Sequence, residues 1–557
     1  MADKKISELT ELTSANVAND FFPLVDSNRT ETKKMNLANL PMSDNAIGQT
    51  FPFTTDFRTG GQITTTSATS ITGGFQFDTE VVYVGSNVTG IDSSAFYNIS
   101  NLKQVTLACP ITSINDFTFG LCTNLTKVNI PDSVTSIGSS AFLYAGLTGE
   151  LNISNSVTSI GSYAFYGTDI TNLVIGDSLS SLGLLSFTFH RHLTGISIDP
   201  ANTNFNTDGK SIIESSTNRL VRFPAQSGVT DYTVPSGVTT IGSHAFSYAL
   251  SLNSITMPDS VTSIEIGAFV DVPITGIDLS GVTGIGNSAF SHSHLTGTIT
   301  IPDTVTSIGD RAFRHCLFFT GVTIGSGLTS LSDSLFFNCH NMVGATIGEN
   351  VTGISDSVFE DCESLTGIII PNSVTSIGSS AFNYCTGLSS ITLGGSLTGI
   401  SSRAFASCKG LTSIRIPDSV TFMGIGAFDL CDGLTDVTIG NSVTSIEDRT
   451  FQECSGLSGI KIPNNITSIG GFAFHDCNRL TGITIPTGVT EIGNHAFDGC
   501  SSLATINSLA ISAPTIGSDV FDNVASTQIN VPAGTRASYQ AAGDGSTYGG
   551  LTIIDIL

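Results

Sequence analysis

The sequence contains no tryptophan, and only 12% of its 557 residues are charged. It has no run of about 18 apolar residues, which a membrane-spanning helix requires. The first residues, MADKKISELTELTS, also lack the apolar segment of a signal peptide. We therefore expect synthesis in the cytoplasm and no membrane insertion. The net charge of −25 comes without any basic run, and phosphate backbones repel such a surface, so nucleic acid is not an expected partner.

Motifs of catalysis are missing as well. The sequence has no GxxxxGK[ST] phosphate loop, no GxGxxG dinucleotide motif and no GxSxG elbow. Acidic residues cluster at Glu360, Asp361 and Glu363, with Glu453 and Asp476 at the same repeat offset as Asp361. A glycosidase pair needs a groove and two distinct environments, whereas these residues are expected along a solvated edge. The sequence predicts no enzymatic activity and no cofactor.

A 23-residue repeat dominates the sequence, and such periods are typical of solenoids. The spacing of one Phe per repeat holds without exception through Phe290, Phe313, Phe336, Phe359, Phe382, Phe405, Phe428, Phe451, Phe474 and Phe497. Upstream, the same step joins Phe96, Phe119, Phe142 and Phe165, while Phe187, Phe269 and Phe521 deviate by one or two residues. Phe246 follows Phe187 by 59 residues, which is one repeat plus an insertion of 36.

One unit, GLTSIRIPDSVTFMGIGAFDLC, runs from Gly410 to Cys431. The LTSIRI segment alternates as a short strand with one buried face does. Pro417 and Asp418 then turn the chain, and a second short extended piece follows. The AFDLC segment predicts a short helical turn with Phe428 and Cys431 pointing inward. One unit cannot bury this apolar surface alone, but stacked neighbours bury it against each other.

These units resemble the BspA-like leucine-rich repeat family, whose signature is close to LTSIxIPxSVTSIGxxAFxxC. The resemblance implies a leucine-rich repeat solenoid, mostly β with short helical turns, of about 18 repeats over residues 78–523. The insertion at about 195–235 looks like a flap of many family members, with Asp208 and Gly209 as its hairpin turn. Residues 524–557 are similar to the family's closing cap, and residues 46–77 are expected to be a linker or β segment.

Nine of the eleven cysteines share the 23-residue step, three residues after each Phe: Cys316, Cys339, Cys362, Cys385, Cys408, Cys431, Cys454, Cys477 and Cys500. Cys122 keeps the same offset, and no C-x-x-C pair is present. Stacked disulfides or a thiolate metal wire would be the functional interpretation. A column of small, buried and reduced thiols is favoured, because upstream repeats are expected to place Tyr144 or Gly167 at this position.

The histidines form two H-x-H pairs, His190 with His192 and His292 with His294. His292 and His315 share a repeat offset and are expected to stack on adjacent coils. No carboxylate at a suitable spacing completes a metal site for the group of His292, His294 and His315. The sequence predicts no metal centre and favours solvated edge histidines.

The outward strand position is the most informative place for binding. It carries Thr256, Thr300, Thr323, Thr346, Thr392, Thr438 and Thr484, interrupted by Ile369, Arg415 and Lys461. A Thr column is a good β-sheet surface that needs no function. The interruptions predict a ligand-binding row of Ile369, Thr392, Arg415, Thr438 and Lys461. Ice binding by the Thr column is disfavoured, because Arg415 and Lys461 interrupt a flat Thr lattice.

Residues 1–45 do not fit the repeat. The segment KKISELTELTSANVANDFFPLVDSNRTETKKMNLANL resembles the N-terminal module of bacteriophage tail-fibre and other virion appendage proteins. The matching positions are Ile6, Leu9, Asp20, Pro23, Val25, Asp26, Thr32, Lys33, Lys34 and Leu37. The resemblance implies attachment to other virion proteins and a homo-oligomer, most simply a trimer. A short helix and hairpin that cap the first coil are the alternative.

Together, the two resemblances favour a phage tail-fibre or spike subunit, located in the virion, whose solenoid binds a glycan or protein of the host surface. One alternative is a structural or decorating virion protein, with the solenoid packed on other virion subunits. The other is a cellular adhesin of the BspA type.

Overall fold

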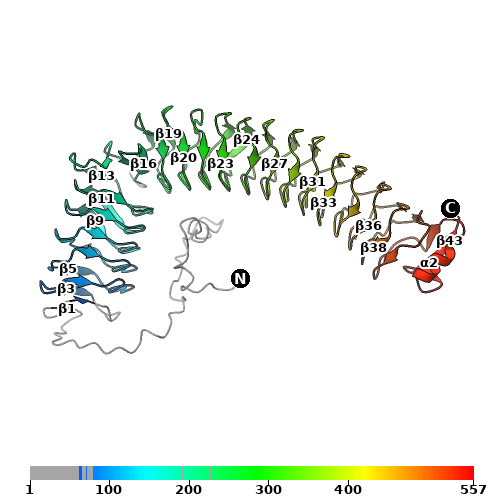
Figure 1. Ribbon diagram of the computed structural model, residues 1–557, viewed down its shortest axis with the longest axis horizontal. Coiled ribbons are helices and arrows are strands. Elements are labelled where there is room, and N and C mark those ends of the chain that lie inside the picture. Colours follow the sequence, from blue (N-terminus) through cyan, green and yellow to red (C-terminus); the bar gives the residue numbers. More distant parts are fainter. Residues whose placement is uncertain (1–61, 66–69, 72–79, 191, 225–227, 557) are drawn as a thin grey trace. The chain divides into compact units, whose positions relative to one another are not determined.

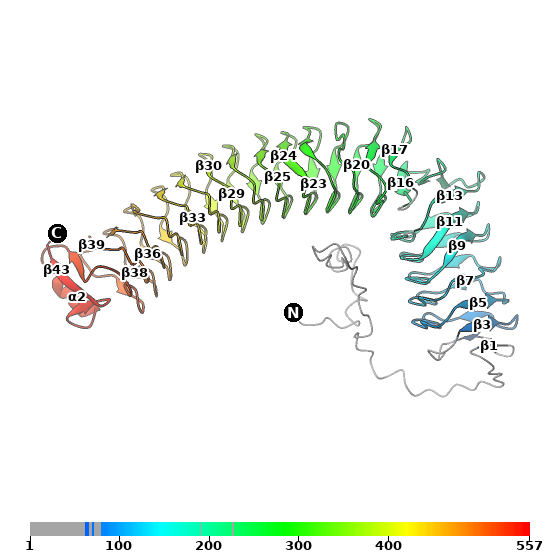
Figure 2. The ribbon, with the colours of Figure 1, turned by 180° about the vertical axis from the view of Figure 1, so that it is seen from behind.

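The computed structural model describes residues 62–65, 70–71, 80–190, 192–224 and 228–556. The predicted attachment segment, residues 1–45, lies outside the described residues. The described chain is a β-solenoid of about 20 coils with almost no helix, which confirms the predicted fold class. Successive coils lie side by side in sequence order, as opposite views show (Figure 1 and Figure 2).

The first strand of each coil forms the first face of the solenoid. Neighbouring strands pair in parallel and in register, for example Ile368 with Ile391 and Ile369 with Thr392. The inward residues are apolar, because alternate side chains of a strand point to opposite faces. The strands of this face are β1 (Gln62–Thr65), β3 (Val81–Val84), β5 (Gln104–Leu107), β7 (Lys127–Val128), β9 (Thr148–Ile153), β11 (Asp169–Ile175), β13 (Gly195–Ile198), β17 (Asp231–Thr233), β19 (Ser254–Thr256), β22 (Gly297–Ile301), β24 (Phe319–Ile324), β26 (Gly344–Thr346), β28 (Gly367–Ile369), β30 (Ser390–Thr392), β32 (Ser413–Arg415), β34 (Asp436–Thr438), β37 (Gly482–Ile485), β39 (Thr505–Ser508), β41 (Gln528–Val531) and β43 (Leu551–Asp555).

A two-residue strand, usually Ser-Ile or Gly-Ile, forms the second face. The Thr just before it adds a hydrogen bond between coils, as when Thr375 Oγ1 donates to the carbonyl of Thr352 at 3.0 Å. These strands are β2 (Ser70–Ile71), β4 (Gly90–Ile91), β6 (Ser113–Ile114), β8 (Ser136–Ile137), β10 (Ser159–Ile160), β12 (Ser181–Leu182), β18 (Thr240–Ile241), β20 (Ser263–Ile264), β21 (Gly284–Ile285), β23 (Ser307–Ile308), β25 (Ser330–Leu331), β27 (Gly353–Ile354), β29 (Ser376–Ile377), β31 (Gly399–Ile400), β33 (Phe422–Met423), β35 (Ser445–Ile446), β36 (Ser468–Ile469), β38 (Glu491–Ile492) and β40 (Thr515–Ile516).

The third side of each coil, expected to be a short helical turn, consists of tight turns. Ser380 and Tyr384 both have a positive φ, of 54° and 58°. The N–H groups of Phe382 and Tyr384 donate to the carbonyls of Ala404 and Ala406 in the next coil, at 2.8 and 2.9 Å. An α-helix would use such donors within one segment. Here the N–H groups of one coil donate to carbonyls of the next coil, so this side also holds adjacent coils together.

The repeat Phe rings stack in the core, with centroids 5.2 Å apart both for Phe359 with Phe382 and for Phe382 with Phe405. They form two files, because the buried side chains separate into two clusters. The N-terminal stack, Ile71 to Ile212, holds the rings from Phe96 to Phe187, and the C-terminal stack, Ile213 to Ile553, holds those from Phe223 to Phe521. The file of Phe rings is therefore interrupted at the insertion.

The insertion divides the two stacks. It forms β14 (Phe205–Asn206), β15 (Ile212–Glu214) and β16 (Arg219–Arg222), which pair antiparallel, and β16 then joins β18 in parallel. Asp208 Oδ1 accepts hydrogen bonds from the N–H groups of Lys210 and Ser211, and Gly209 has a φ of 87°, so Asp208 and Gly209 lie in the predicted turn. Ile212 of β15 packs into the N-terminal stack and Ile213 into the C-terminal stack.

The described coils extend past the expected limits of the repeats at both ends. β1 and β2 pair with β3 and β4, within the segment expected to be a linker or β segment. At the other end, β43 pairs in parallel with β41 and antiparallel with β42 (Thr547–Tyr548). The helix α2 (Arg536–Ala542) buries Tyr539 beside this edge. Within the described residues, no helix has the length and apolar character that crossing a bilayer requires.

Candidate binding surface

The five residues of the predicted row lie next to each other on the first face. Ile369 pairs with Thr392, Arg415 with Thr438, and Thr438 with Lys461. All five side chains are exposed, and Ile369 is 71% exposed. The row, called the outward row below, therefore spans five consecutive coils, with a break in strand pairing between β30 and β32.

The residues beside the outward row on the same face are small or polar. Each member alternates with buried or partly buried apolar residues, such as Ile368 and Ile370 beside Ile369. Two residues earlier on the same face stand the small or short residues Gly367, Ser390, Ser413, Asp436 and Gly459. Because these neighbours are small, the long side chains of Arg415 and Lys461 stand clear of the sheet.

The cations of the row are available to a partner. In the part of the chain that the structure describes, neither Arg415 nor Lys461 forms an ion pair. Other cations do, such as Lys409 with Asp432 at 3.6 Å. Exposed pairs of this kind contribute little to stability. Arg415 and Lys461 are separated by Thr438, so two positive charges repeat along one face at every second coil.

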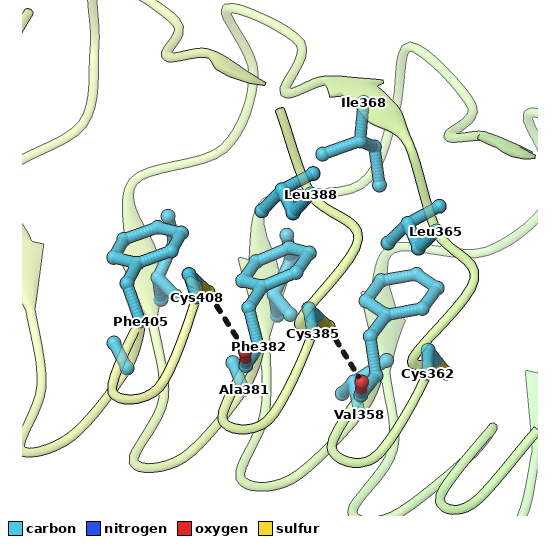
Figure 3. Packing of buried hydrophobic residues seen from close by; sticks show 14 of the residues in the cluster. Val358, Cys362, Leu365, Ile368, Ala381, Phe382, Cys385, Leu388, Phe405 and Cys408 are labelled. Carbon is cyan, nitrogen blue, oxygen red and sulfur yellow. Dashed lines mark hydrogen bonds between the residues drawn. The ribbon is translucent and has the colours of Figure 1, made fainter. Parts of the chain in front are cut away.

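The cysteine column has a packing role. All eleven thiols are free and buried. Each thiol of the column donates to the carbonyl of the Phe one coil earlier, for instance Cys385 Sγ to Phe359 O at 3.1 Å (Figure 3). Burial raises the pKa of Cys316 to about 12 and that of Cys385 well above its usual range, so these thiols stay protonated and unreactive at neutral pH.

Upstream coils fill the thiol position with other residues than expected. The structure places Ala145 and Thr168 there, both buried. Tyr144 and Gly167 lie one position earlier, where φ is positive, and Tyr144 is 38% exposed. The expectation of Tyr144 or Gly167 at this site is wrong, because the inward position is the third residue after the Phe. The cysteine position of the column nevertheless tolerates other residues, since Ala145 and Thr168 occupy it in upstream coils.

His292 and His315 stack as predicted, with ring centroids 4.6 Å apart. The expectation of solvated edge histidines is wrong for His190, which is fully buried. Burial, with smaller effects of His292, Arg314 and His340, lowers the pKa of His315 to about 3. His294 instead faces the ring of Phe318 at 4.7 Å. Among the described residues, no group of three or more His, Cys, Asp or Glu side chains is arranged to hold a metal ion.

The acidic cluster contacts neighbouring coils. Glu360 Oε1 accepts a hydrogen bond from Asn383 Nδ2 at 2.9 Å, and Glu363 lies 3.7 Å from His340. Burial, and then the charge of Glu360, raises the pKa of Asp361. These contacts tie adjacent coils together along the edge.

A recess on the first face was not predicted. It has a volume of about 250 Å³ and is lined by residues 276–280 and by Thr296, Thr298 and Thr300. The coil between β19 and β22 forms no first-face strand, and this opens the recess. The signal was present in the sequence, because Phe290 follows Phe269 by 21 residues rather than 23.

Known proteins match the chain in repeat pattern and fold. The model of the BspA type leucine-rich repeat region matches residues 76–208, 222–343, 308–435 and 423–542. A leucine-rich repeat protein of Bacteroides ovatus is 26% identical, with a TM-score of 0.52 over 64% of this chain and 97% of that one. A leucine-rich repeat protein of Eubacterium ventriosum is 23% identical, with a TM-score of 0.46 over 66% of this chain and 90% of that one.

A leucine-rich cell surface protein of Faecalibacterium prausnitzii is 28% identical, with a TM-score of 0.36 over 56% of this chain and 79% of that one. No curated protein sequence matches the chain. The family matches leave residues 209–221 uncovered, within the insertion, and they cover well over half of the chain. The chain belongs to the BspA type leucine-rich repeat family.

Proposed function

We propose that the protein is a binding solenoid of the BspA adhesin type, whose outward row contacts a glycan or protein on a cell surface. The observation that carries the proposal is the exposure of Ile369 in line with Arg415 and Lys461. Neighbouring coils place Thr at the same position, so the scaffold does not require these larger side chains. An Ile that is 71% exposed gains little from burial in the free protein.

The chemistry of the row favours an anionic partner. Arg415 can form forked hydrogen bonds to carboxylate or sulfate groups, and Lys461 adds a point charge. Two coils separate these cations, or about 10 Å at the usual spacing of strands. A polysaccharide with a repeating acidic group could contact both, while Ile369 packs against an apolar sugar face.

The test replaces Ile369, Arg415 and Lys461 together by Thr, the residue of neighbouring coils. Because the sites are exposed, unfolding free energy should stay within about 1 kcal/mol of the parent. Binding should be measured on an array of sulfated, carboxylated and uncharged glycans, and should fall at least about tenfold on the charged ones.

A matched control carries the same chemistry elsewhere. Lys127, Arg479 and Ile511 are exposed residues outside the row, and their replacement by Thr should leave glycan binding unchanged. Equal binding by the row variant and its parent would move the site away from the outward row, for example to the recess beside β22 or to the insertion.

A virion appendage, or a decorating virion protein, is the second candidate. It rests on the ISELT, PLVD and TKK motifs of residues 1–45, which resemble tail-fibre attachment modules. Deletion of residues 1–45 should leave the solenoid folded but abolish incorporation into a particle and the expected trimeric assembly. Normal assembly of the truncated chain would contradict the attachment role.

A further inference from the structure

Strand β16 carries an arginine where the repeat calls for a small residue. Phe223 continues the ring file, with its centroid 5.1 Å from that of Phe246. The residue just before the Phe is Ala245 or Ala268 in the next coils and Ser186 in the coil before the insertion, all buried. In β16 this position is Arg222, and only 3% of it is exposed. A charged side chain therefore occupies a core position.

The guanidinium of Arg222 is only partly satisfied. Its Nη1 donates to the carbonyl of His244 at 2.8 Å. Its Nε and Nη2 are buried and have no hydrogen-bond partner among the described residues. Burial lowers the pKa of Arg222 to about 10, so the group remains charged at neutral pH. An uncompensated buried charge is costly, and proteins normally pair it.

The titratable neighbours of Arg222 do not supply the missing charge. His190 is fully buried, and its Nδ1 lies 2.8 Å from the carbonyl of Thr168. Burial, and to a lesser extent the charge of Arg222, lowers the pKa of both His190 and His244. Both imidazoles are therefore neutral, and burial together with nearby tyrosines raises the pKa of Tyr166. The surroundings of Arg222 contain neutral groups where an anion would be expected.

Arg222 is one of the residues that line a cavity between the last coil of the N-terminal stack and the first coil of the C-terminal stack, while protein atoms cover its Nε and Nη2 in the unliganded chain. The cavity has a volume of about 170 Å³, and it is lined by residues 182–188 together with Arg219, Val221, Arg222 and Ser243. A cavity of about 150 Å³ holds a benzene-sized molecule. The space therefore suits a small anion or one acidic group of a larger partner.

Arg219, three residues earlier, binds a carboxylate through Nε and Nη2, the two nitrogens that have no partner in Arg222. Arg219 presents its Nε and Nη2 to Glu265, at 3.0 and 2.6 Å. This is the side-on fork that matches the two oxygens of a carboxylate or phosphate. Arg222 leaves the same two nitrogens without a partner, and it lines the cavity.

We propose that the cavity at Arg222 is an oxyanion site, in which the guanidinium turns toward the cavity so that its Nε and Nη2 bind a carboxylate, phosphate or sulfate group. The site is separate from the outward row and does not depend on the proposed function. It lies where the insertion meets the repeats, so an anion bound there would also join the two stacks.

The test is the thermal unfolding midpoint of the full chain in sodium chloride, with sodium phosphate, sulfate or acetate added at constant ionic strength. A ligand that binds the folded state raises the midpoint with the logarithm of its concentration. We expect such a logarithmic rise with at least one of these anions. A rise with phosphate and sulfate alone indicates a tetrahedral oxyanion, and a rise with acetate indicates a carboxylate.

Arg222→Met is the decisive variant, because Met is apolar and of similar length. Replacing an unpaired buried charge in this way is often neutral or stabilising, so the variant should match or exceed the parent in chloride alone. Its affinity for the anion should fall at least about tenfold, so that the parent overtakes it at high anion concentration. Arg479→Met, at an exposed arginine, should keep the response of the parent.

Two results would overturn the site. One is an absence of any anion-specific shift in the parent protein. The other is an equal affinity of Arg222→Met and the parent for the same anions. This affinity is measured by calorimetric titration of the folded proteins, so that a change in folding cannot imitate a change in binding.

Discussion

The two stacks solve the same packing problem with different residues. In the C-terminal stack, the third residue after the Phe is Cys in every coil from Cys316 to Cys500. In the N-terminal stack the same position holds Ile99, Cys122, Ala145, Thr168 and His190. The ring spacing hardly differs, at 5.0 Å for Phe142 with Phe165 and 5.2 Å for Phe382 with Phe405. The Phe file thus sets the geometry, and its neighbour only has to fill a small volume.

The two stacks also differ in how they are joined. Within each, strands of adjacent coils pair, but in the described residues no sheet contains strands from both sides of the insertion. The connection is made by side chains of the insertion, Phe205 and Ile212 toward one core and Ile213 toward the other, and by the ring contact of Phe189 with Tyr248 at 4.9 Å. Since repeat proteins are stabilised by nearest-neighbour interfaces, we expect the two stacks to unfold as separate cooperative units.

The largest effect is expected from Phe382→Ala. Truncation of a fully buried aromatic costs about 3–5 kcal/mol, and Phe382 stacks on both of its neighbours. The loss should be confined to the C-terminal stack, as measured by hydrogen exchange of each stack in increasing denaturant. Phe142→Ala should give the mirror result. Equal destabilisation of both stacks by either variant would show that they form one cooperative unit.

Acidification should weaken the N-terminal stack through His190. Burial is the main reason that the pKa of this histidine falls to about 3, against 6.5 in an unfolded chain. The unfolded state therefore binds the proton first, and stability falls as pH drops below about 6.5. Between pH 7 and 4 the loss should be on the order of 3 kcal/mol.

His190→Cys places the residue of other coils at this position and supplies the control. It should remove most of this pH dependence, measured by urea unfolding of the N-terminal stack. A pH profile identical to that of the parent would mean that other groups carry the acid sensitivity.

The smallest effect is expected from exchanging residues of the cysteine column between the stacks. Cys385→Ala should cost about 1 kcal/mol, since it removes one buried atom and the carbonyl of Phe359 keeps its backbone partner, the N–H of Cys362. Ala145→Cys should change stability by less than about 1 kcal/mol. A loss above about 3 kcal/mol in Cys385→Ala would show that the thiol does more than fill space.

The sequence was sufficient for most of the fold, because the Phe spacing reports directly on the stacking period. The outward row could also be placed, since the alternation of LTSIRI and its relatives decides which side chains face outward. The tight turns of the third side could not be predicted, because the AFDLC pattern suits a helical turn equally well until the neighbouring coil takes its N–H groups. The division of the Phe file depends on how β15 packs, which repeat periodicity does not encode. Arg222 was detectable, as the one charged residue before a Phe of the file, yet its burial and unpaired nitrogens required the structure.

The in-register pairing of coils has a genetic consequence. The backbone bonds that join coils link residues about one repeat apart, such as Thr375 N with Thr352 O and Thr398 N with Thr375 O. A deletion or duplication of DNA encoding one whole 23-residue unit would therefore restore every bond with the next unit along. A change that is not a whole number of units would alter at least one coil, as the 21-residue coil between Phe269 and Phe290 lacks a first-face strand. The gain or loss of a whole unit would therefore change the length of the C-terminal stack while each remaining coil stays intact.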